Sequence, residues 1–260
     1  MKVVLFCGGF GTRLREHSDV VPKPLVDIGN RPILWHLMKY YAHYGHKDFI
    51  LCLGYKGEMI KDFFLKYDSY QYRDFVMQDG GKTLTPAESD IRDWTIRFVD
   101  TGLHAKIGER LVAVKEHVMD EEMFLANYSD QLSDFPLPKL IEFHKKNDMT
   151  ASFVCARPSH SFHSLNVDAQ GFVTGFRSAA DAGLWINGGY MLLNREIFDH
   201  IRPGEELVEE PFGRLLEQRK LGAIKWPGFW AAMDTFKDKI MFDRMNGRGE
   251  RPWEIWANGG

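Results

Sequence analysis

A glycine-rich loop near the start of the sequence, Gly8-Gly9-Phe10-Gly11-Thr12-Arg13-Leu14, is the first segment that could do chemistry. Glycines leave backbone N–H groups unshielded, so such a loop after a strand suits phosphate oxygens or the edge of a nucleotide base. The Walker pattern needs Lys and then Ser or Thr after its last glycine, where this chain has Thr12 and Arg13; the dinucleotide fingerprint needs a glycine where it has Leu14. The loop is therefore either a phosphate-binding turn of another kind or a purely structural turn.

A lysine between two prolines follows about ten residues later, in the segment Pro22-Lys23-Pro24. Prolines restrict the backbone on both sides, so the ammonium of Lys23 is presented from a stiff segment. Together with Arg13 it places two cations near one glycine loop, which is the charge that a triphosphate requires. The alternative is that Lys23 is a solvated surface residue.

Strand-like and helix-like segments alternate over residues 1–156. The helix-like segments show apolar residues at helical spacing, and the strand-like ones are short apolar or alternating runs. This alternation predicts βαβ units on a largely parallel sheet. The expected strands are 2–7, 49–53, 94–99, 124–127 and 150–156, and the expected helices are 32–44, 58–67, 108–118 and 137–147.

The pattern changes after residue 156. Short strand candidates at 164–167, 173–177 and 189–194 are separated by Gly, Asp and Ala turns, and helices are expected at 211–219 and 237–245. A stretch that contains Pro and Gly leads to Trp230 and is assigned no element. We expect one domain over residues 1–260, with a more antiparallel, substrate-facing second part from residue 157.

The composition excludes several functional classes. A net charge of −3 argues against a general nucleic-acid binder, and no window approaches the roughly 18 apolar residues that a membrane span needs. The N-terminus is too short for a signal peptide before the first strand. Cys7, Cys52 and Cys155 lie far apart in apolar stretches and suggest neither a disulfide framework nor a zinc site. We therefore expect a cytoplasmic protein that binds no nucleic acid and no membrane.

Several segments together resemble the sugar-1-phosphate nucleotidyltransferases. "GGFGTRL" and "PKPLVDIGNRPILWH" are similar to the N-terminal signature of that family, and "LCLGYKGEMIKDFF", "DWTIRFVDTG", "WINGGYMLLN" and "PGFWAAMDTFKDK" follow in the family's order. The resemblance covers nearly the whole chain and is closest to the branch that transfers cytidylyl groups. It implies an α/β, Rossmann-like mixed sheet, mostly parallel, with helices on both faces.

The resemblance also implies the reaction and its partners. CTP and a sugar 1-phosphate, by default glucose 1-phosphate, bind side by side; the sugar phosphate attacks the α-phosphorus and pyrophosphate leaves, with Mg²⁺ as the cofactor. Residues 1–156 would bind the nucleotide and 157–260 the acceptor, and a homo-oligomer is expected. Arg13 and Lys23 are the expected catalytic cations. The expected nucleotide-binding residues are Gly8, Gly9, Gly11, Thr12, Arg13, Lys23, Thr101, Gly102 and Arg110. For Arg110, a solvated helix face is the alternative.

Two aspartates match the family's metal-binding segments. Asp130 follows an expected strand in "LANYSDQ", and Asp234 lies in "AAMDTFKD". Carboxylate oxygens are the ligands that Mg²⁺ prefers, and few are needed because phosphates and waters complete its shell. The alternatives are a turn residue for Asp130 and the N-cap of the last helix for Asp234. Asp134 is expected to be a turn or cap residue.

The acceptor side departs from the family. Asn187, Gly188 and Trp230 are the expected acceptor-binding residues, but the lysine that meets the sugar phosphate in the family is replaced by Ala179, and Arg177 is the candidate substitute. His160 and His163 are new in the preceding segment, and Ser129 and Gln131 stand where the metal loop usually has glycines. Two alternatives follow: the same chemistry on a different phosphorylated acceptor, or a non-catalytic nucleotide-binding regulator.

Overall fold

A seven-stranded mixed sheet forms the centre of the molecule in a computed structural model, which describes residues 1–9, 21–67, 74–86, 89–158, 163–178 and 183–258. All neighbouring strands are parallel except β13, which runs antiparallel to both of its neighbours. The predicted mixed, mostly parallel sheet is therefore confirmed. In spatial order the strands are β14 (Leu221–Trp226), β10 (Ala151–Ala156), β13 (Ile186–Asn194), β8 (Met123–Asn127), β1 (Val3–Phe6), β4 (Asp48–Leu53) and β7 (Thr95–Asp100).

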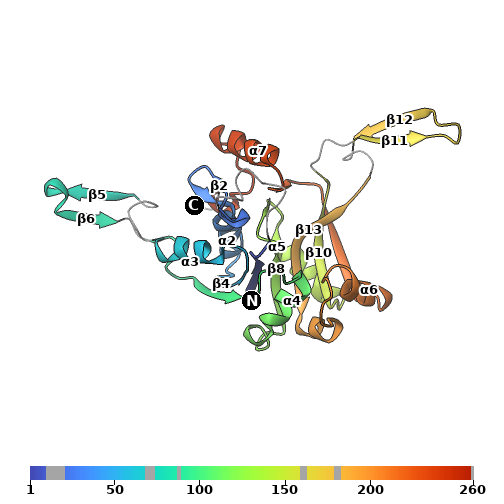
Figure 1. The fold of residues 1–260 in the computed structure, drawn as a ribbon, viewed down its shortest axis with the longest axis horizontal. Helices are drawn as coiled ribbons and strands as arrows, with labels where there is room; N and C mark the ends of the chain where they lie inside the picture. The colour runs from blue at the N-terminus through green and yellow to red at the C-terminus, as the bar shows by residue number, and fades with distance from the viewer. Residues whose placement is uncertain (10–20, 68–73, 87–88, 159–162, 179–182, 259–260) are drawn as a thin grey trace.

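Helices cover both faces of this sheet (Figure 1). The alternation of side chains along β1 sends Val3 and Leu5 to one apolar core and Val4 and Phe6 to the other. The first core takes side chains from α2 (Ile33–His43), α3 (Gly57–Leu65), α5 (Leu137–Lys146) and α7 (Phe236–Gly247). The second takes side chains from α4 (Ile107–Ala113) and α6 (Glu210–Glu217).

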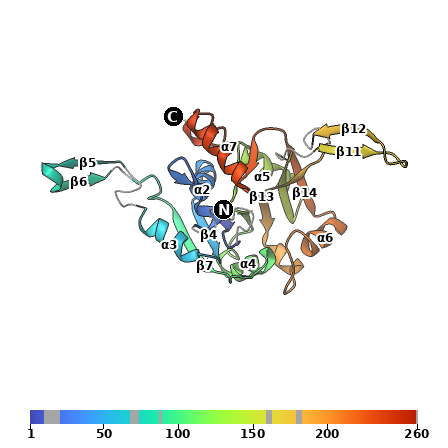
Figure 2. The same cartoon turned by 45° about the horizontal axis from the view of Figure 1, so that its top comes forward.

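Two hairpins project from opposite ends of the molecule (Figures 1 and 2). One pairs β5 (Phe75–Gln78) with β6 (Thr83–Pro86), and the other pairs β11 (His163–Val167) with β12 (Val173–Ser178). The sequence predicted the second pair of strands but not the first. Neither hairpin joins the central sheet.

Small elements complete the fold. Two further two-stranded sheets pair β2 (Asp27–Ile28) with β3 (Arg31–Pro32) and β9 (Gln131–Ser133) with β15 (Trp230–Ala232). The 3₁₀ turns are η2 (Lys23–Leu25), η3 (Asp79–Gly81), η4 (Lys115–His117), η5 (Arg195–His200) and η6 (Ile255–Asn258). In the described part of the chain, no helix has the length and apolar character that crossing a bilayer requires.

Two expectations about the elements were wrong. The helix expected over 108–118 ends at Ala113, because Val114 leaves the helical region with φ −105° and valines lose side-chain freedom in a helix. The stretch before Trp230 contains β14, an edge strand parallel to β10. Its half-exposed residues alternate with exposed Ala223 and Lys225, so it lacks the apolar run that marked the other strands.

The order of the strands reverses beside β1. Along the chain, β1 is followed by β4 and then β7 on one side, and the next strand of the sheet, β8, lies on the other side of β1. In open α/β sheets, ligands bind in the crevice outside the carboxyl ends of the strands at such a reversal. The residues that follow β1 and β8 are therefore the place to look for a site.

Candidate active site

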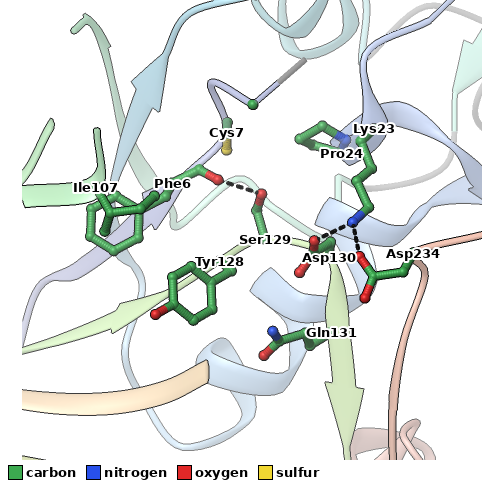
Figure 3. A pocket seen from close by; sticks show the side chains of 11 residues that line it. Phe6, Cys7, Lys23, Pro24, Ile107, Tyr128, Ser129, Asp130, Gln131 and Asp234 are labelled. Carbon is green, nitrogen blue, oxygen red and sulfur yellow. Dashed lines mark hydrogen bonds and ion pairs between the residues drawn. The ribbon is translucent and has the colours of Figure 1, made fainter. Parts of the chain in front are cut away.

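A cavity of about 310 Å³ opens at the carboxyl ends of β1 and β8. Phe6 at the end of β1 and Cys7 after it line the cavity, residues 128–131 line it from the segment that follows β8, and Lys23 and Asp234 close it from the side (Figure 3). Gly9 of the glycine loop lies on its wall. The cavity thus joins the loop to the residues that the sequence analysis assigned to phosphate and metal.

An ion cluster of three side chains lies in this cavity (Figure 3). The Nζ atom of Lys23 is 2.5 Å from Oδ2 of Asp130 and 2.7 Å from Oδ1 of Asp234. The three side chains are only 15%, 16% and 21% exposed. The solvated-surface alternative for Lys23 is wrong, because one largely buried ammonium bridges two carboxylates.

Short backbone elements bring the three residues together. In the β9–β15 ladder Ala232 is opposite Gln131, and the N–H of Met233 donates to the carbonyl of Asp130 over 2.9 Å. The two aspartates therefore lie on adjacent, hydrogen-bonded segments. Asp234 is not the N-cap of α7, because Thr235 caps that helix in a capping box with Asp238.

Burial and the attraction between opposite charges together set the pKa values of the three side chains of this cluster. Burial raises the pKa of the Asp130 carboxyl, and the Lys23 ammonium opposes this only in part. Burial alone would lower the pKa of Lys23, but the attraction of Asp130 and Asp234 raises it. The lysine is therefore held in its charged form. The Oδ1 atom of Asp130 is buried and has no hydrogen-bond partner among the described residues.

These carboxylates fit a magnesium ion better than a metal held by protein ligands alone. No group of three or more His, Cys, Asp or Glu side chains in the described part of the chain could hold a metal. Mg²⁺ needs only one or two carboxylates when substrate phosphates and waters supply the other ligands. The unpartnered Oδ1 of Asp130 is an oxygen ready to accept such a cation. Asp130 and Asp234 are the residues that could hold it.

Arg110 lies beneath the glycine loop rather than on a solvated helix face, so that alternative is wrong. It is 3% exposed, and its guanidinium donates to the carbonyl of Gly8 over 3.1 Å and to that of Leu53 over 3.1 Å. A side chain at Gly8 would collide with it, since an added Cβ would lie 2.0 Å from Nη1 of Arg110. The absence of a side chain at Gly8 is thus what lets an arginine support the loop.

Thr101 supports the same arginine. Its hydroxyl accepts from Nη1 of Arg110 over 2.7 Å and donates to the carbonyl of Leu53 over 2.8 Å. Gly102 has φ +96°, in the left-handed region that favours glycine, and its N–H donates to Oδ1 of Asp100. The structure therefore brings Gly8, Gly9, Thr101 and Arg110 to one edge of the sheet. Gly11, Thr12 and Arg13 lie outside the described residues.

The two side chains that replace family glycines are accommodated locally. Ser129 has φ +68°, and its hydroxyl donates to the carbonyl of Phe6 over 2.8 Å, which ties the loop after β8 to the end of β1. The Gln131 side chain packs against Gly189, where an added Cβ would lie 1.8 Å from Oε1. Neither replacement blocks Asp130 from the cavity. Gly189 therefore leaves the room that the Gln131 side chain occupies.

The predicted acceptor residues lie next to the cluster. Oδ1 of Asn187 accepts from the N–H of Gly189, and its Nδ2 lies 3.4 Å from the hydroxyl of Tyr128, which lines the cavity. The indole of Trp230 donates to the carbonyl of Gly188 over 2.8 Å and so links β15 to β13. Asp134 accepts from the indole of Trp226, a structural role in line with its expected turn.

Arg177 lies on β12 in a projecting hairpin, opposite Ser164, and its side chain is outside the described part. Ala179 and His160 are also outside it, and for His163 only the strand position is described. The structure therefore leaves the proposed substitute for the family lysine as a prediction.

A cationic cluster on the predicted acceptor side was not found from the sequence. Arg157 lies 5.6 Å and Lys225 5.5 Å from the ring of Trp185. Trp185 lies two residues before Asn187 in the chain, whereas Lys225 lies two strands from Asn187, because both are opposite Cys155 in the central sheet. Neither cation has a carboxylate partner among the described residues. The members of the cluster are scattered in sequence, and the pairing of β10 with both β13 and β14 brings them together.

Comparisons with known proteins agree with this fold. The model of the family described as nucleotidyl transferase matches residues 2–212, so the chain belongs to the nucleotidyl transferase family. More particularly, it is 38% identical to glucose-1-phosphate cytidylyltransferase of Salmonella typhi over 98% of this chain and 100% of that protein. It is 34% identical to a probable glucose-1-phosphate cytidylyltransferase of Bacillus subtilis, again over 98% and 100%. The fold is similar to that of HddC from Yersinia pseudotuberculosis, with a TM-score of 0.65, 20% identity and 94% and 99% of the two chains covered.

Proposed function

We propose that this enzyme transfers CMP from CTP to glucose 1-phosphate, forming CDP-glucose and pyrophosphate. The observation on which this rests is the Lys23–Asp130–Asp234 cluster beside the glycine loop, at the reversal of strand order. The nucleotide and the acceptor follow from the full-length similarity to cytidylyltransferases.

The chain's own groups supply positioning and charge. A phosphate oxygen of the acceptor attacks the α-phosphorus of CTP, the bond from that phosphorus to the bridging oxygen breaks, and pyrophosphate leaves with the bond electrons. Lys23 lies where it can neutralise charge that grows on the leaving group. Asp130 and Asp234 would hold a Mg²⁺ ion, whose chemistry when bound is to neutralise the phosphates that the transfer brings together. No covalent enzyme intermediate is required.

A pyrophosphate-release screen tests the proposal. CTP, dTTP, UTP and ATP are each combined with glucose 1-phosphate and a panel of other phosphorylated acceptors, with Mg²⁺ and with excess EDTA. We expect CTP with glucose 1-phosphate to give the highest kcat/KM and EDTA to abolish release. If no pair of nucleotide and acceptor released pyrophosphate, the result would favour a non-catalytic nucleotide-binding regulator. If another acceptor gave a higher kcat/KM than glucose 1-phosphate, that acceptor would be the preferred substrate.

A second acceptor class is favoured by the cluster of Arg157, Trp185 and Lys225. Its Trp185 lies two residues before Asn187 in the chain, and its Lys225 lies two strand spacings, or about 10 Å, from Asn187 across the sheet. In this second candidate function, the two cations hold a second anionic group on the same sugar rather than the phosphate that attacks beside Asp130. The candidate is a sugar 1-phosphate that carries a further phosphate or carboxylate.

Matched acceptors separate the two classes. Glucose 1,6-bisphosphate and glucuronate 1-phosphate differ from glucose 1-phosphate only in a second anion at the far end. If the cluster binds that anion, one of them has a KM below that of glucose 1-phosphate, and Arg157→Gln removes the difference. If glucose 1,6-bisphosphate and glucuronate 1-phosphate both have a KM equal to or higher than that of glucose 1-phosphate, glucose 1-phosphate remains the acceptor.

We also propose that the enzyme is cytoplasmic and forms a homo-oligomer. Burial raises the pKa of the Cys7 thiol to about 12, which keeps it protonated and unreactive as expected of a structural thiol. Both hairpins expose large apolar side chains, Met77 at 63%, and Phe172 and Phe176 at 70% each. Isolated two-stranded hairpins are marginally stable in water, so contact with another copy would stabilise them. Light scattering after size exclusion tests the assembly, and a mass of 30 kDa would contradict it.

A further inference from the structure

The bridging position of Lys23 has a consequence for the order in which ligands bind. Its ammonium contacts one oxygen of Asp130 and one of Asp234, so it occupies the space between the two carboxylates. A divalent cation held by both aspartates would lie beside this ammonium, and like charges that are close together in a largely buried site repel each other. The ammonium and the metal would therefore compete for the two carboxylates.

The backbone of Lys23 is restrained, while its side chain can rotate. Lys23 begins the 3₁₀ turn η2, Pro22 precedes it in an extended conformation with φ −66°, and Pro24 is buried. The side chain has four rotatable bonds, and the wall of the cavity that it faces includes Gly9. The ammonium can thus turn from the carboxylates toward the part of the wall that Gly9 forms, where a phosphate of the triphosphate would receive it.

We infer that Lys23 is the resident cation of the Asp130–Asp234 pair and yields this position to the metal only when a triphosphate is present to receive its ammonium. A metal that arrives alone leaves a largely buried ammonium without a counter-ion, which is unfavourable. A metal that arrives with a triphosphate gives the lysine new anionic partners. Metal and nucleotide therefore bind with positive coupling, and by linkage each raises the affinity for the other by the same factor.

Manganese binding measured by electron paramagnetic resonance tests this inference without turnover. The full-length protein is titrated with Mn²⁺ alone and with α,β-methylene-CTP, in which the bond that transfer would break is replaced, and Mn²⁺ bound by the analogue in solution is subtracted. In the wild type we expect the analogue to raise the affinity for Mn²⁺ by about tenfold or more. No increase would overturn the inference, and this arm needs no variant.

The variant Lys23→Met is expected to bind Mn²⁺ without the analogue about tenfold more tightly than the wild type, and to lose most of the coupling. Lys23→Gln is the second variant if the first does not fold. Lys47→Met is the control, because Lys47 pairs with Asp93 on the surface away from the cavity. Adding Asp130→Asn to Lys23→Met should abolish the gain. An unchanged Mn²⁺ affinity in both Lys23 variants would overturn the inference.

The inference rests on the proposed metal-dependent transfer. Different experimental results would contradict the lysine exchange and the transfer. Metal-dependent pyrophosphate release with no change of Mn²⁺ binding in the Lys23 variants would overturn the lysine exchange alone. The expected Mn²⁺ behaviour with no pyrophosphate release from any acceptor would support the exchange and overturn the transfer.

Discussion

The cavity and the cationic cluster at the ends of the neighbouring strands are built differently. In the cavity, on the predicted nucleotide side, Lys23, Asp130 and Asp234 are largely buried and bonded to one another, and Arg110 supports Gly8 of the loop. On the predicted acceptor side, exposed Arg157 and Lys225 flank Trp185 at the ends of strands, and Arg177 lies in a projecting hairpin. Buried, paired charges are held in fixed positions, whereas exposed side chains at strand ends can be exchanged without disturbing them.

The largest effects should come from the metal-binding pair. We expect Asp130→Asn and Asp234→Asn each to lower kcat by about a hundredfold or more, because a carboxylate that helps to neutralise the transition state is lost. Steady-state pyrophosphate release measures this, with Asp134→Asn as the nearby control. A kcat close to that of the wild type in either variant would remove that residue from the metal site.

Acid should destabilise the fold around the buried His36. Burial lowers the pKa of His36 to about 4, and its ring accepts a hydrogen bond from the indole of Trp253. The unfolded chain therefore binds the proton first, so stability falls as the pH drops from about 6.5 to about 4, by up to about 3 kcal/mol. Urea unfolding of His36→Gln should show a smaller loss over this window, and exposed His43→Gln the full loss. Identical pH profiles for His36→Gln and the wild type would contradict the assignment.

Two neighbouring glycines of the loop, Gly8 and Gly9, should differ in how much an added methyl group destabilises the protein. Gly8→Ala should destabilise the protein by about 1–3 kcal/mol, because its methyl group would meet the buried guanidinium of Arg110. Gly9→Ala should leave stability nearly unchanged, since no atom lies within 4 Å of the added Cβ. Chemical unfolding compares the two. Equal stabilities would mean that Arg110 can move aside, and the loop would lose its proposed support.

The sequence predicted those features of the two regions that depend on neighbouring residues, and missed those that depend on contacts between distant segments. The strands of the central sheet and most helices of residues 1–156 follow from local periodicity, whereas the β5–β6 hairpin and the end of α4 do not; Lys23, Asp130 and Asp234 follow from motifs that resemble a family. The position of Arg110 and the pairing of Lys225 with Cys155 depend on packing between segments about 60 to 100 residues apart. No local pattern records such contacts. The same holds for β14, an edge strand whose exposed Ala223 and Lys225 hid its pairing with β10.

The smallest effects are expected from exposed cations on the predicted acceptor side, and these effects are on the acceptor KM. Lys225→Gln should raise the KM for a doubly anionic acceptor about three- to tenfold and leave that for glucose 1-phosphate within about twofold, because an exposed cation contributes about 1 kcal/mol. Arg177→Ala should raise the KM of every phosphorylated acceptor if Arg177 replaces the lysine lost at Ala179. Saturation curves at fixed CTP measure both. If no acceptor KM changes in Arg177→Ala, the acceptor phosphate has another anchor.

The separation of a reacting site around Asp130 from a recognition site around Arg157 is tested most directly by one steady-state comparison of Asp130→Asn with Arg157→Gln, using CTP and whichever of glucose 1,6-bisphosphate and glucuronate 1-phosphate has the lower KM. The account predicts that Asp130→Asn lowers kcat by about a hundredfold or more and changes the acceptor KM little. It predicts that Arg157→Gln raises the acceptor KM and leaves kcat within about twofold. If both variants changed the same parameter, or if Arg157→Gln lowered kcat as strongly as Asp130→Asn, the separation would be contradicted.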